Sequence, residues 1–130
     1  MQFKYKKVMT LDERKAEYNK VIKNNPGKIA IICEREPKNQ IPEIDKTKYL
    51  INEEFNLTQF TKIIRKKLNI DEKEALFFLV NGKVSLTGDL TMLEIYKKYK
   101  DEDGFLYIAY ASEIIWGNNK KVNKNNNIII

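Results

Sequence analysis

Residues 29–33, IAIIC, are apolar at every position, and three of the five are isoleucine. A short, continuous run rich in β-branched side chains predicts a strand. The charged segment 34–46, EREPKNQIPEIDK, contains two prolines and predicts a loop. Residues 48–51, KYLI, follow as a second strand candidate. Two apolar runs joined by one loop predict a β-hairpin.

A helical pattern precedes this hairpin. Residues 10–25 predict a helix in which Thr10 and Glu13 form a capping box, and Pro26-Gly27 ends the pattern. The basic segment 3–7, FKYKK, predicts a further helical turn. Because its aromatic residues alternate with lysines, the segment also suits contact with an anionic membrane.

Helical and strand patterns alternate after the hairpin. The predicted elements are a helix at 57–68, strands at 75–80 and 83–86, a short helix opened by a Thr91–Glu94 capping box, and a strand at 105–111. Asn81-Gly82 is a strong two-residue turn signal between the strands at 75–80 and 83–86. This order predicts an α+β fold, a β-grasp layout with helices on one face of a mixed sheet and two additional N-terminal helices.

Composition restricts the range of functions. The chain of 130 residues fits one domain and contains no apolar run as long as the roughly 20 residues of a membrane span. The N-terminus has no apolar signal core, so we expect a cytoplasmic protein. The absence of histidine excludes Ser-His-Asp and Cys-His nucleophiles and histidine metal ligands. The single cysteine, Cys33, lies in a strand-like run and is expected to be a small buried hydrophobe.

Charge is distributed unevenly along the chain. The net charge is +6, and the asparagine-rich segment 118–130 carries three lysines and no acid, which leaves +3 for residues 1–117. Such a mildly basic domain suits acidic peptides or an anionic membrane surface. The composition changes after Gly117, and residues 118–130 predict a flexible tail, which we expect to be removed.

Several strings in the right order resemble one known family. FKYKK, DKTKYLI, IIRKKL, ALFFLVNG and GFLYIAYASEIIWG are similar to the autophagy ubiquitin-like modifiers, the family of GABA-receptor-associated protein and the microtubule-associated light-chain-three proteins. The resemblance covers residues 1–117 and implies a ubiquitin-like β-grasp. With it the expected parts are an N-terminal helical extension (1–27), the β-grasp domain (28–117) and the tail (118–130).

The resemblance also implies a chemistry at the C-terminal glycine. The matching residue is Gly117, preceded by Trp116. In this family a processing cysteine protease exposes the glycine, and activating and conjugating enzymes carry it as successive thioesters. It ends as an amide on phosphatidylethanolamine, which places the lipidated form on the autophagosome or the vacuole or lysosome membrane. A carbonyl on glycine suits this chemistry because no Cβ hinders attack.

Family members also bind cargo receptors through short motifs with an aromatic residue and, three positions later, an aliphatic one. The peptide adds as a strand to an exposed sheet edge, with two pockets for the side chains. The matching first-pocket residues are Glu17, Val21, Ile32, Lys48, Leu50 and Phe105, and the second-pocket residues are Tyr49, Ile51, Phe55, Phe60 and Ile63. Lys28, Lys46 and Lys48 are expected to meet acidic residues that flank such motifs.

The residue types also predict which of these side chains are exposed. Leu50, Phe60 and Ile63 are expected in the core, whereas Tyr49 and Phe105 are better candidates for partial exposure. Ala30 stands where the family usually has a proline in a wall of the first pocket. The segment 85–92 is one residue longer than in the family and lacks the family's prolines.

Three alternatives stay open. A non-conjugated ubiquitin-like adaptor that uses only the peptide face would share the fold. A nucleic-acid binder would fit the basic pI. However, the lysines are spread over helices and loops, and no aromatic stacking motif of the kind found in single-strand binders is present, so no nucleic acid is expected. An enzyme would need Cys33 and lacks a glycine-rich phosphate loop, so neither catalysis nor a cofactor is expected.

Overall fold

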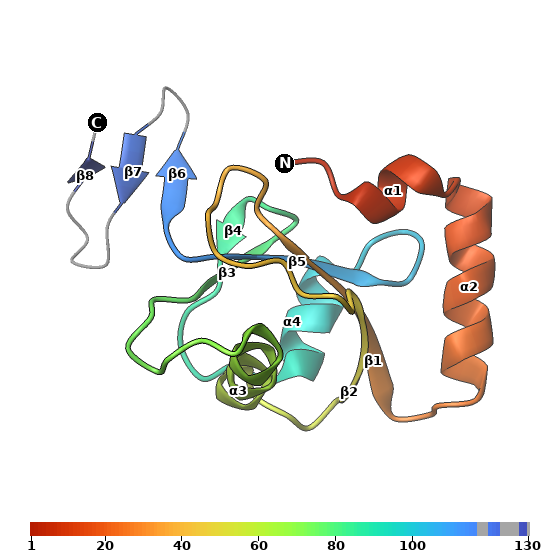
Figure 1. Cartoon of the computed structure of the whole chain (residues 1–130). Helices are drawn as coiled ribbons and strands as arrows, with labels where there is room; N and C mark the ends of the chain where they lie inside the picture. The colour runs from red at the N-terminus through yellow and green to blue at the C-terminus, as the bar shows by residue number, and fades with distance from the viewer. Residues whose placement is uncertain (117–119, 123–127, 130) are drawn as a thin grey trace.

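The computed structural model describes residues 1–116, 120–122 and 128–129, with side chains described for residues 1–113. Helices and strands are intermixed along the chain (Figure 1). The helices are α1 (Lys4–Val8), α2 (Leu11–Lys23), α3 (Leu57–Leu68) and α4 (Met92–Tyr99). The strands of the main sheet are β1 (Lys28–Arg35), β2 (Lys48–Asn52), β3 (Phe77–Val80), β4 (Val84–Ser85) and β5 (Leu106–Ala111).

The main sheet is mixed and has five strands in the order β2-β1-β5-β3-β4. β1 and β5 run parallel, with Ile31 opposite Leu106, and the other neighbouring pairs are antiparallel. Asn81 and Gly82 form the turn between β3 and β4 with φ of 56° and 70°, as their sequence predicts. The expected α+β β-grasp with two additional N-terminal helices is confirmed.

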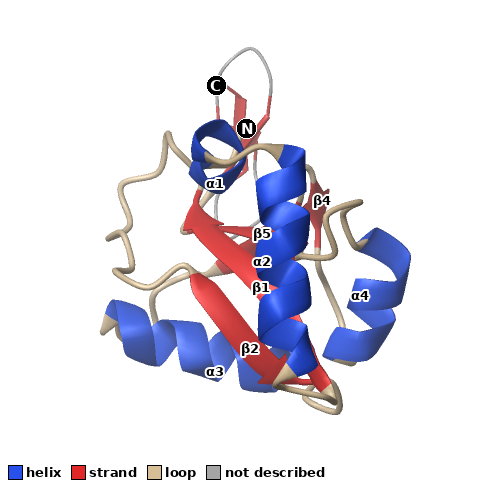
Figure 2. Cartoon of the chain, turned by 90° about the vertical axis from the view of Figure 1, so that its right-hand side faces the viewer, coloured by secondary structure: helices blue, strands red, loops and turns tan. Residues whose placement is uncertain are grey.

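Helices cover both faces of this sheet, not one face as expected (Figures 1 and 2). α3 and α4 pack on the face that carries Ile31 and Cys33, whereas α1 and α2 cover the face that carries Ala30 and Ile32. Alternate residues of a strand point to opposite faces. Because residues 29–33 are apolar at every position, this strand needs packing partners on both faces of the sheet. The sequence therefore already indicated that both faces are buried.

Reciprocal side-chain caps fix the starts of the longer helices. The expected boxes are present at Thr10–Glu13 and Thr91–Glu94, and a third, Asn56–Gln59, opens α3. The apolar stripe of α3 is buried as predicted. The short segment before α2 forms α1, which also agrees with the sequence prediction.

A buried polar cluster fixes the N-terminal helices to the turn between α4 and β5. The Arg14 Nε donates to Asp103 Oδ2 at 2.8 Å, and the Tyr107 hydroxyl donates to the same oxygen. Burial and the Asp103 carboxylate raise the pKa of Tyr107 far above its ordinary value. Lys6 forms an ion pair with Asp101 in the same turn. These contacts hold α1 and α2 against the sheet.

Beyond β5 a second, small antiparallel sheet contains β6 (Ile114–Trp116), β7 (Lys120–Val122) and β8 (Ile128–Ile129). β7 and β8 lie within the segment expected to be a flexible tail. The division into 1–27, 28–117 and 118–130 stays a prediction. No helix in the described part of the chain combines the length and apolarity of a bilayer span.

Candidate functional site

β2 is an edge strand, because among the described strands it pairs with β1 alone. Its outer backbone groups can therefore accept a further strand. Side chains alternate along it: Leu50 is 37% exposed, whereas its neighbours Tyr49 and Ile51 are 4% and 5% exposed. The edge thus lies between two different environments, one on each face of the sheet.

The residues expected in the first pocket converge on the face covered by α2. Ile32 lies opposite Lys48 in the register, and the Lys48 Nζ donates to Glu17 Oε1 of α2 at 2.8 Å. Phe105 and Ile32 are fully buried in one cluster, against which Val21 packs. The structure therefore brings Glu17, Val21, Ile32, Lys48, Leu50 and Phe105 together between β2 and α2.

The residues expected in the second pocket lie on the other face. Tyr49, Ile51 and Phe60 belong to the larger core cluster, and Phe55 and Ile63 pack against it partly buried. An extended peptide along β2 directs successive side chains to opposite sides. The two sets of residues therefore lie on opposite faces of the sheet beside β2, and their role in binding a peptide stays a prediction.

The exposure predictions for single residues were partly wrong. Tyr49 and Phe105 are 4% and 0% exposed, not partly exposed, and Leu50, expected in the core, is the exposed member. The Tyr49 hydroxyl donates to the Lys46 carbonyl at 2.6 Å, which anchors its ring inward. Phe60 is fully buried as expected, and Ile63 is half-buried.

Charged groups surround the edge. Lys28 and Lys46 are exposed, and Lys48 is half-buried by its ion pair with Glu17. The hydrogen bond and charge of Lys48 lower the pKa of Glu17. A lysine attracts acidic peptide residues most strongly when it has no ion-pair partner, but Lys48 already pairs with Glu17. Lys28 and Lys46 therefore present the freer positive charges.

Two aromatic residues of the site were not foreseen as part of it. Tyr5 of α1 and Tyr18 of α2 both contact the Phe105 ring edge-on, each with ring centroids 5.5 Å apart. The Lys48 Nζ lies 5.5 Å from the Tyr5 ring. Burial, followed by the charge of Glu17, raises the pKa of Tyr5 to about 12. The sequence predicted helical structure for both segments, but nothing in it showed which surface those helices would meet.

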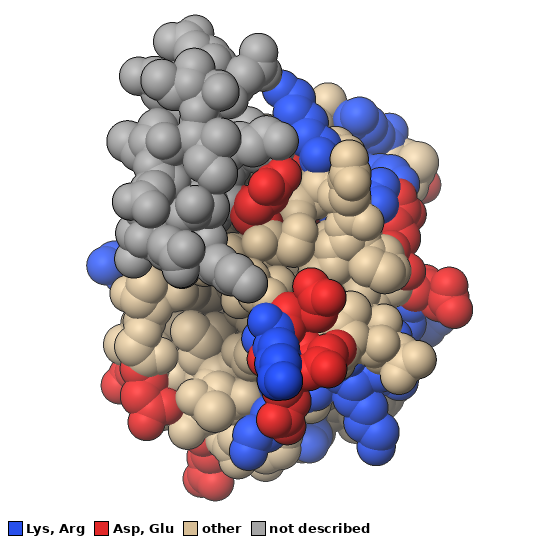
Figure 3. Space-filling view, turned by 60° about the vertical axis from the view of Figure 1, so that its left-hand side comes forward, with Lys and Arg blue, Asp and Glu red and all other residues tan. Residues whose placement is uncertain are grey.

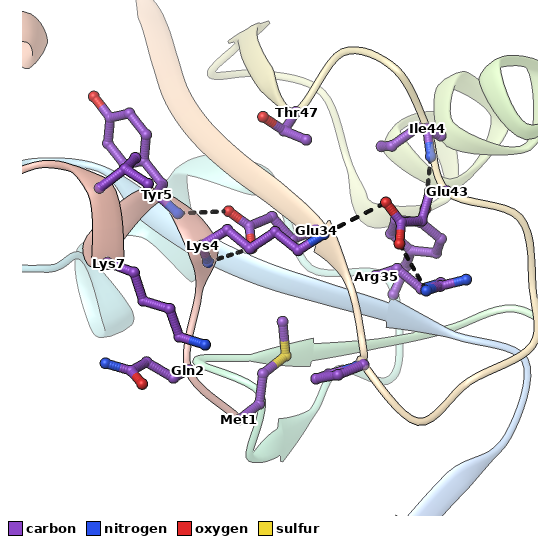
Figure 4. A pocket seen from close by; sticks show the side chains of 13 residues that line it. Met1, Gln2, Lys4, Tyr5, Lys7, Glu34, Arg35, Glu43, Ile44 and Thr47 are labelled. Atoms are coloured by element: carbon purple, nitrogen blue, oxygen red, sulfur yellow. Dashed lines mark hydrogen bonds and ion pairs between the residues drawn. The ribbon is translucent and has the colours of Figure 1, made fainter.

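A pocket of about 490 Å³ lies beside this site, between α1 and the loop from β1 to β2 (Figure 4). Tyr5 lines it and also touches the first set of residues. The Glu34 carboxylate accepts from the backbone N–H groups of Lys4 and Tyr5 at 2.7 and 3.1 Å, which holds the start of α1. Glu43 pairs with Lys4 at 3.6 Å and with Arg35 at 2.7 Å.

The described residues 1–116 end directly before the expected cleavage glycine. Trp116 is the last residue of β6, and Gly117 lies outside the described residues. In the part of the chain that is described, no group of three or more Cys, Asp and Glu side chains could hold a metal ion.

The surface carries both charge signs. Figure 3 shows acidic and basic side chains interspersed on the visible face, without a broad region of one sign. Nucleic-acid binding proteins concentrate Lys and Arg on one face or stripe. The visible face lacks such a stripe.

Comparisons with known proteins agree with this geometry. A family model described as "Autophagy protein Atg8 ubiquitin like" matches residues 13–117. The chain is 38% identical to proteins named "Autophagy-related protein 8" from Kluyveromyces lactis and Kluyveromyces marxianus, over 90% of this chain and 94% of each relative. The crystal structure of Trypanosoma brucei ATG8 matches with a TM-score of 0.81 and 36% identity, covering 85% of this chain and 95% of that one.

Proposed function

Because the chain belongs to the Atg8 family of autophagy-related ubiquitin-like proteins, we propose that it is a modifier cleaved after Gly117 and conjugated to phosphatidylethanolamine. The observation that carries this proposal is the position of the glycine. The family match ends at residue 117, directly after Trp116, and the composition changes there. The lipidated form would act in autophagosome formation and in recruiting cargo receptors.

In this proposal the chain is a substrate and an adaptor, not an enzyme. A processing cysteine protease hydrolyses the bond between Gly117 and Asn118 and so frees the glycine carboxylate. An activating enzyme uses ATP to form an acyl adenylate on the glycine, and its thiol displaces AMP to give a thioester. The acyl group passes to the thiol of a conjugating enzyme, and the amine of phosphatidylethanolamine displaces that thiol to form an amide. The chain supplies an unhindered carbonyl, since Gly117 has no Cβ.

The edge of β2 supports the second part of the proposal, the binding of aromatic-x-x-aliphatic motifs. A docked strand would gain main-chain hydrogen bonds from the outer edge of β2. Its aromatic side chain would enter beside Lys48 and Leu50, and its aliphatic side chain would lie near Phe55 and Ile63, which border the other face. This order makes the peptide run parallel to β2.

The location follows from the same chemistry. The unconjugated chain would be cytoplasmic, and the lipidated chain would lie on the autophagosome or the vacuole or lysosome membrane. The alternative is a non-conjugated adaptor that uses only the β2 edge in vesicle trafficking. The mass of the cellular protein separates the two, because an adaptor keeps residues 118–130.

The direct test is incubation of the full chain with a processing protease of this family, followed by mass spectrometry. We expect one product that ends at Gly117. A chain from which Gly117 alone has been deleted is the matched control and should stay intact. An intact wild-type chain, or a cut at another position, would contradict the proposal and favour the adaptor.

A further inference from the structure

Asn39 is a buried side chain in an otherwise charged loop. It is 4% exposed, although it lies between the exposed residues Lys38 and Gln40. Its Oδ1 accepts from both the backbone N–H and the hydroxyl of Ser112, each at 2.7 Å. Its Nδ2 donates to the Glu113 carbonyl at 3.0 Å and to Glu36 Oε2 at 3.2 Å. The amide therefore uses both its ends on the segment that follows β5.

The loop around Asn39 is itself held in place. The Glu36 N–H donates to the Tyr110 carbonyl at 2.9 Å, and the Asn39 N–H donates to the Glu36 carbonyl at 3.1 Å. The sheet register of β5 ends at Ala111, opposite Phe77. Asn39 thus supplies partners for the first two residues after the register ends. A buried amide with all these groups paired is a strong local constraint.

The segment after Glu113 depends on this constraint once the tail is gone. β6 pairs with β7, and β7 follows Gly117 in the chain. Cleavage after Gly117 would remove β7, so β6 would lose the partner that the structure gives it. Asn39 would then hold the last anchored residues before the glycine.

We propose that Asn39 is a positioning residue for the reactions at Gly117, because it fixes the point at which the C-terminal segment leaves the domain. The inference rests on the proposed function. Gly117 is four residue steps beyond the Glu113 anchor, which limits the reach of the glycine to about 14 Å. An anchor that retreats to Ala111 extends that reach to about 21 Å. The longer free segment must be ordered by each enzyme that binds it.

The experiment uses the product of cleavage after Gly117, in which β7 is gone, and measures KM and kcat for its activation by the family's activating enzyme, at a temperature where every variant is folded. We expect Asn39→Ala to raise KM about fivefold and to leave kcat unchanged, because ordering two more residues weakens binding and not chemistry. Gln40→Ala, an exposed amide in the same loop, is the matched control and should behave as wild type. A merely structural role would lower stability without changing KM.

A conservative variant tests the hydrogen bonds themselves. In the double variant Asn39→Asp with Glu36→Gln, the carboxylate at position 39 still accepts from Ser112. The hydrogen bond between residues 36 and 39 is kept with its direction reversed, because the amide introduced at position 36 now donates to the carboxylate at position 39. The double variant lacks the donor to the Glu113 carbonyl and the acceptor that Glu36 Oε2 offers to the Lys38 N–H, so we expect a KM between those of wild type and Asn39→Ala. A KM equal to that of Asn39→Ala would overturn the assignment.

Amide hydrogen exchange separates this inference from the proposed function. In Asn39→Ala the Ser112 amide should exchange at least about tenfold faster, since its buried acceptor is gone, while the Cys33 amide in β1 is unchanged. An unchanged Ser112 rate or an unchanged KM would overturn the inference. Failure of the wild-type chain to be cleaved would overturn the proposed function, and the Ser112 rate would still decide the anchoring.

Discussion

Tyr49 and Leu50 are neighbours whose side chains lie on opposite faces of β2. The residue types favoured a buried leucine and an accessible tyrosine, and the structure has the reverse. Register decides the outcome: Tyr49 shares a face with Ile51, and Leu50 shares a face with Lys48. The sequence supplied the alternation, but only packing against α2 and α3 shows which face is closed. Residue type alone did not predict the exposure of these side chains, and the membership of the peptide site stays a prediction.

The exposed Leu50 provides the sharpest test of the peptide site. Leu50→Ala should weaken binding of an aromatic-x-x-Leu peptide by about 1 to 2 kcal/mol without loss of stability, because the side chain is already 37% exposed. Val84→Ala is the matched control, since Val84 is 43% exposed on β4 at the opposite edge of the sheet. Titration calorimetry measures both. Equal peptide affinity of the two variants would show that the edge of β2 does not bind the peptide.

Gly117 allows a second residue-level prediction. Gly117→Ala should fold as wild type but be cleaved and lipidated poorly, because the added methyl crowds the reacting carbonyl. A chain that ends at Gly117 should be lipidated without protease. The measurement is a gel-shift assay with activating and conjugating enzymes, ATP and phosphatidylethanolamine vesicles. Rapid lipidation of a chain that ends at Trp116 would refute the role of the glycine.

At the scale of elements, the predictable parts were those specified by local chemistry. The Thr10–Glu13 and Thr91–Glu94 boxes and the Asn81-Gly82 turn all lie where their residues place them. The face covered by α2 was missed, because a helix pattern shows which side is apolar but not which surface it meets. The contacts of Arg14 with Asp103 decide that, and these residues are far apart in the sequence.

α1 shows how packing changes a functional expectation. Phe3 is 4% exposed and its ring centroid lies 5.2 Å from that of Tyr107, and Tyr5 contacts Phe105. These aromatic residues face the sheet, so they are not available to a membrane in this conformation. Val8, 77% exposed in the last turn of α1, is the apolar residue that faces outward beside the lysines.

We therefore expect Val8→Asp to reduce tethering of anionic vesicles by the lipidated chain, because it replaces an apolar contact by a negative charge near the membrane. Stability should change by less than about 0.5 kcal/mol, since the side chain packs against little. Val84→Asp, at an exposed valine on β4, is the control. Vesicle clustering is followed by light scattering, and equal clustering by both variants would contradict a role for α1.

At the scale of the whole molecule, the titration behaviour follows from burial. The chain has no histidine, so no side chain with an ordinary pKa titrates between about pH 5 and 8. The buried tyrosines keep their protons throughout this range. Burial, above all other causes, raises the pKa of Tyr49 and of Tyr110 to about 12 in the folded state.

Stability should accordingly be lost in alkali. The unfolded tyrosine has a pKa of about 10, so below that pH both states bind the proton and the stabilisation is complete. Between about pH 10 and 12 the unfolded state loses protons that the folded state keeps, and the free energy of unfolding falls by roughly 2 kcal/mol per buried tyrosine. Urea titrations at several pH values measure this. Tyr49→Phe should have a shallower alkaline decline, and an identical decline would contradict the assignment to Tyr49.

The parallel pairing of β1 with β5 has a consequence for folding during synthesis on the ribosome. These central strands come from near the two ends of the domain's sequence, so a ribosome must release nearly the whole domain before they can meet. Until then β1 exposes apolar side chains on both faces and an unpaired edge. Non-local pairings form slowly, because loop closure precedes any gain from contact. The nascent chain is therefore a natural client for chaperones, and its core closes only at the end of synthesis.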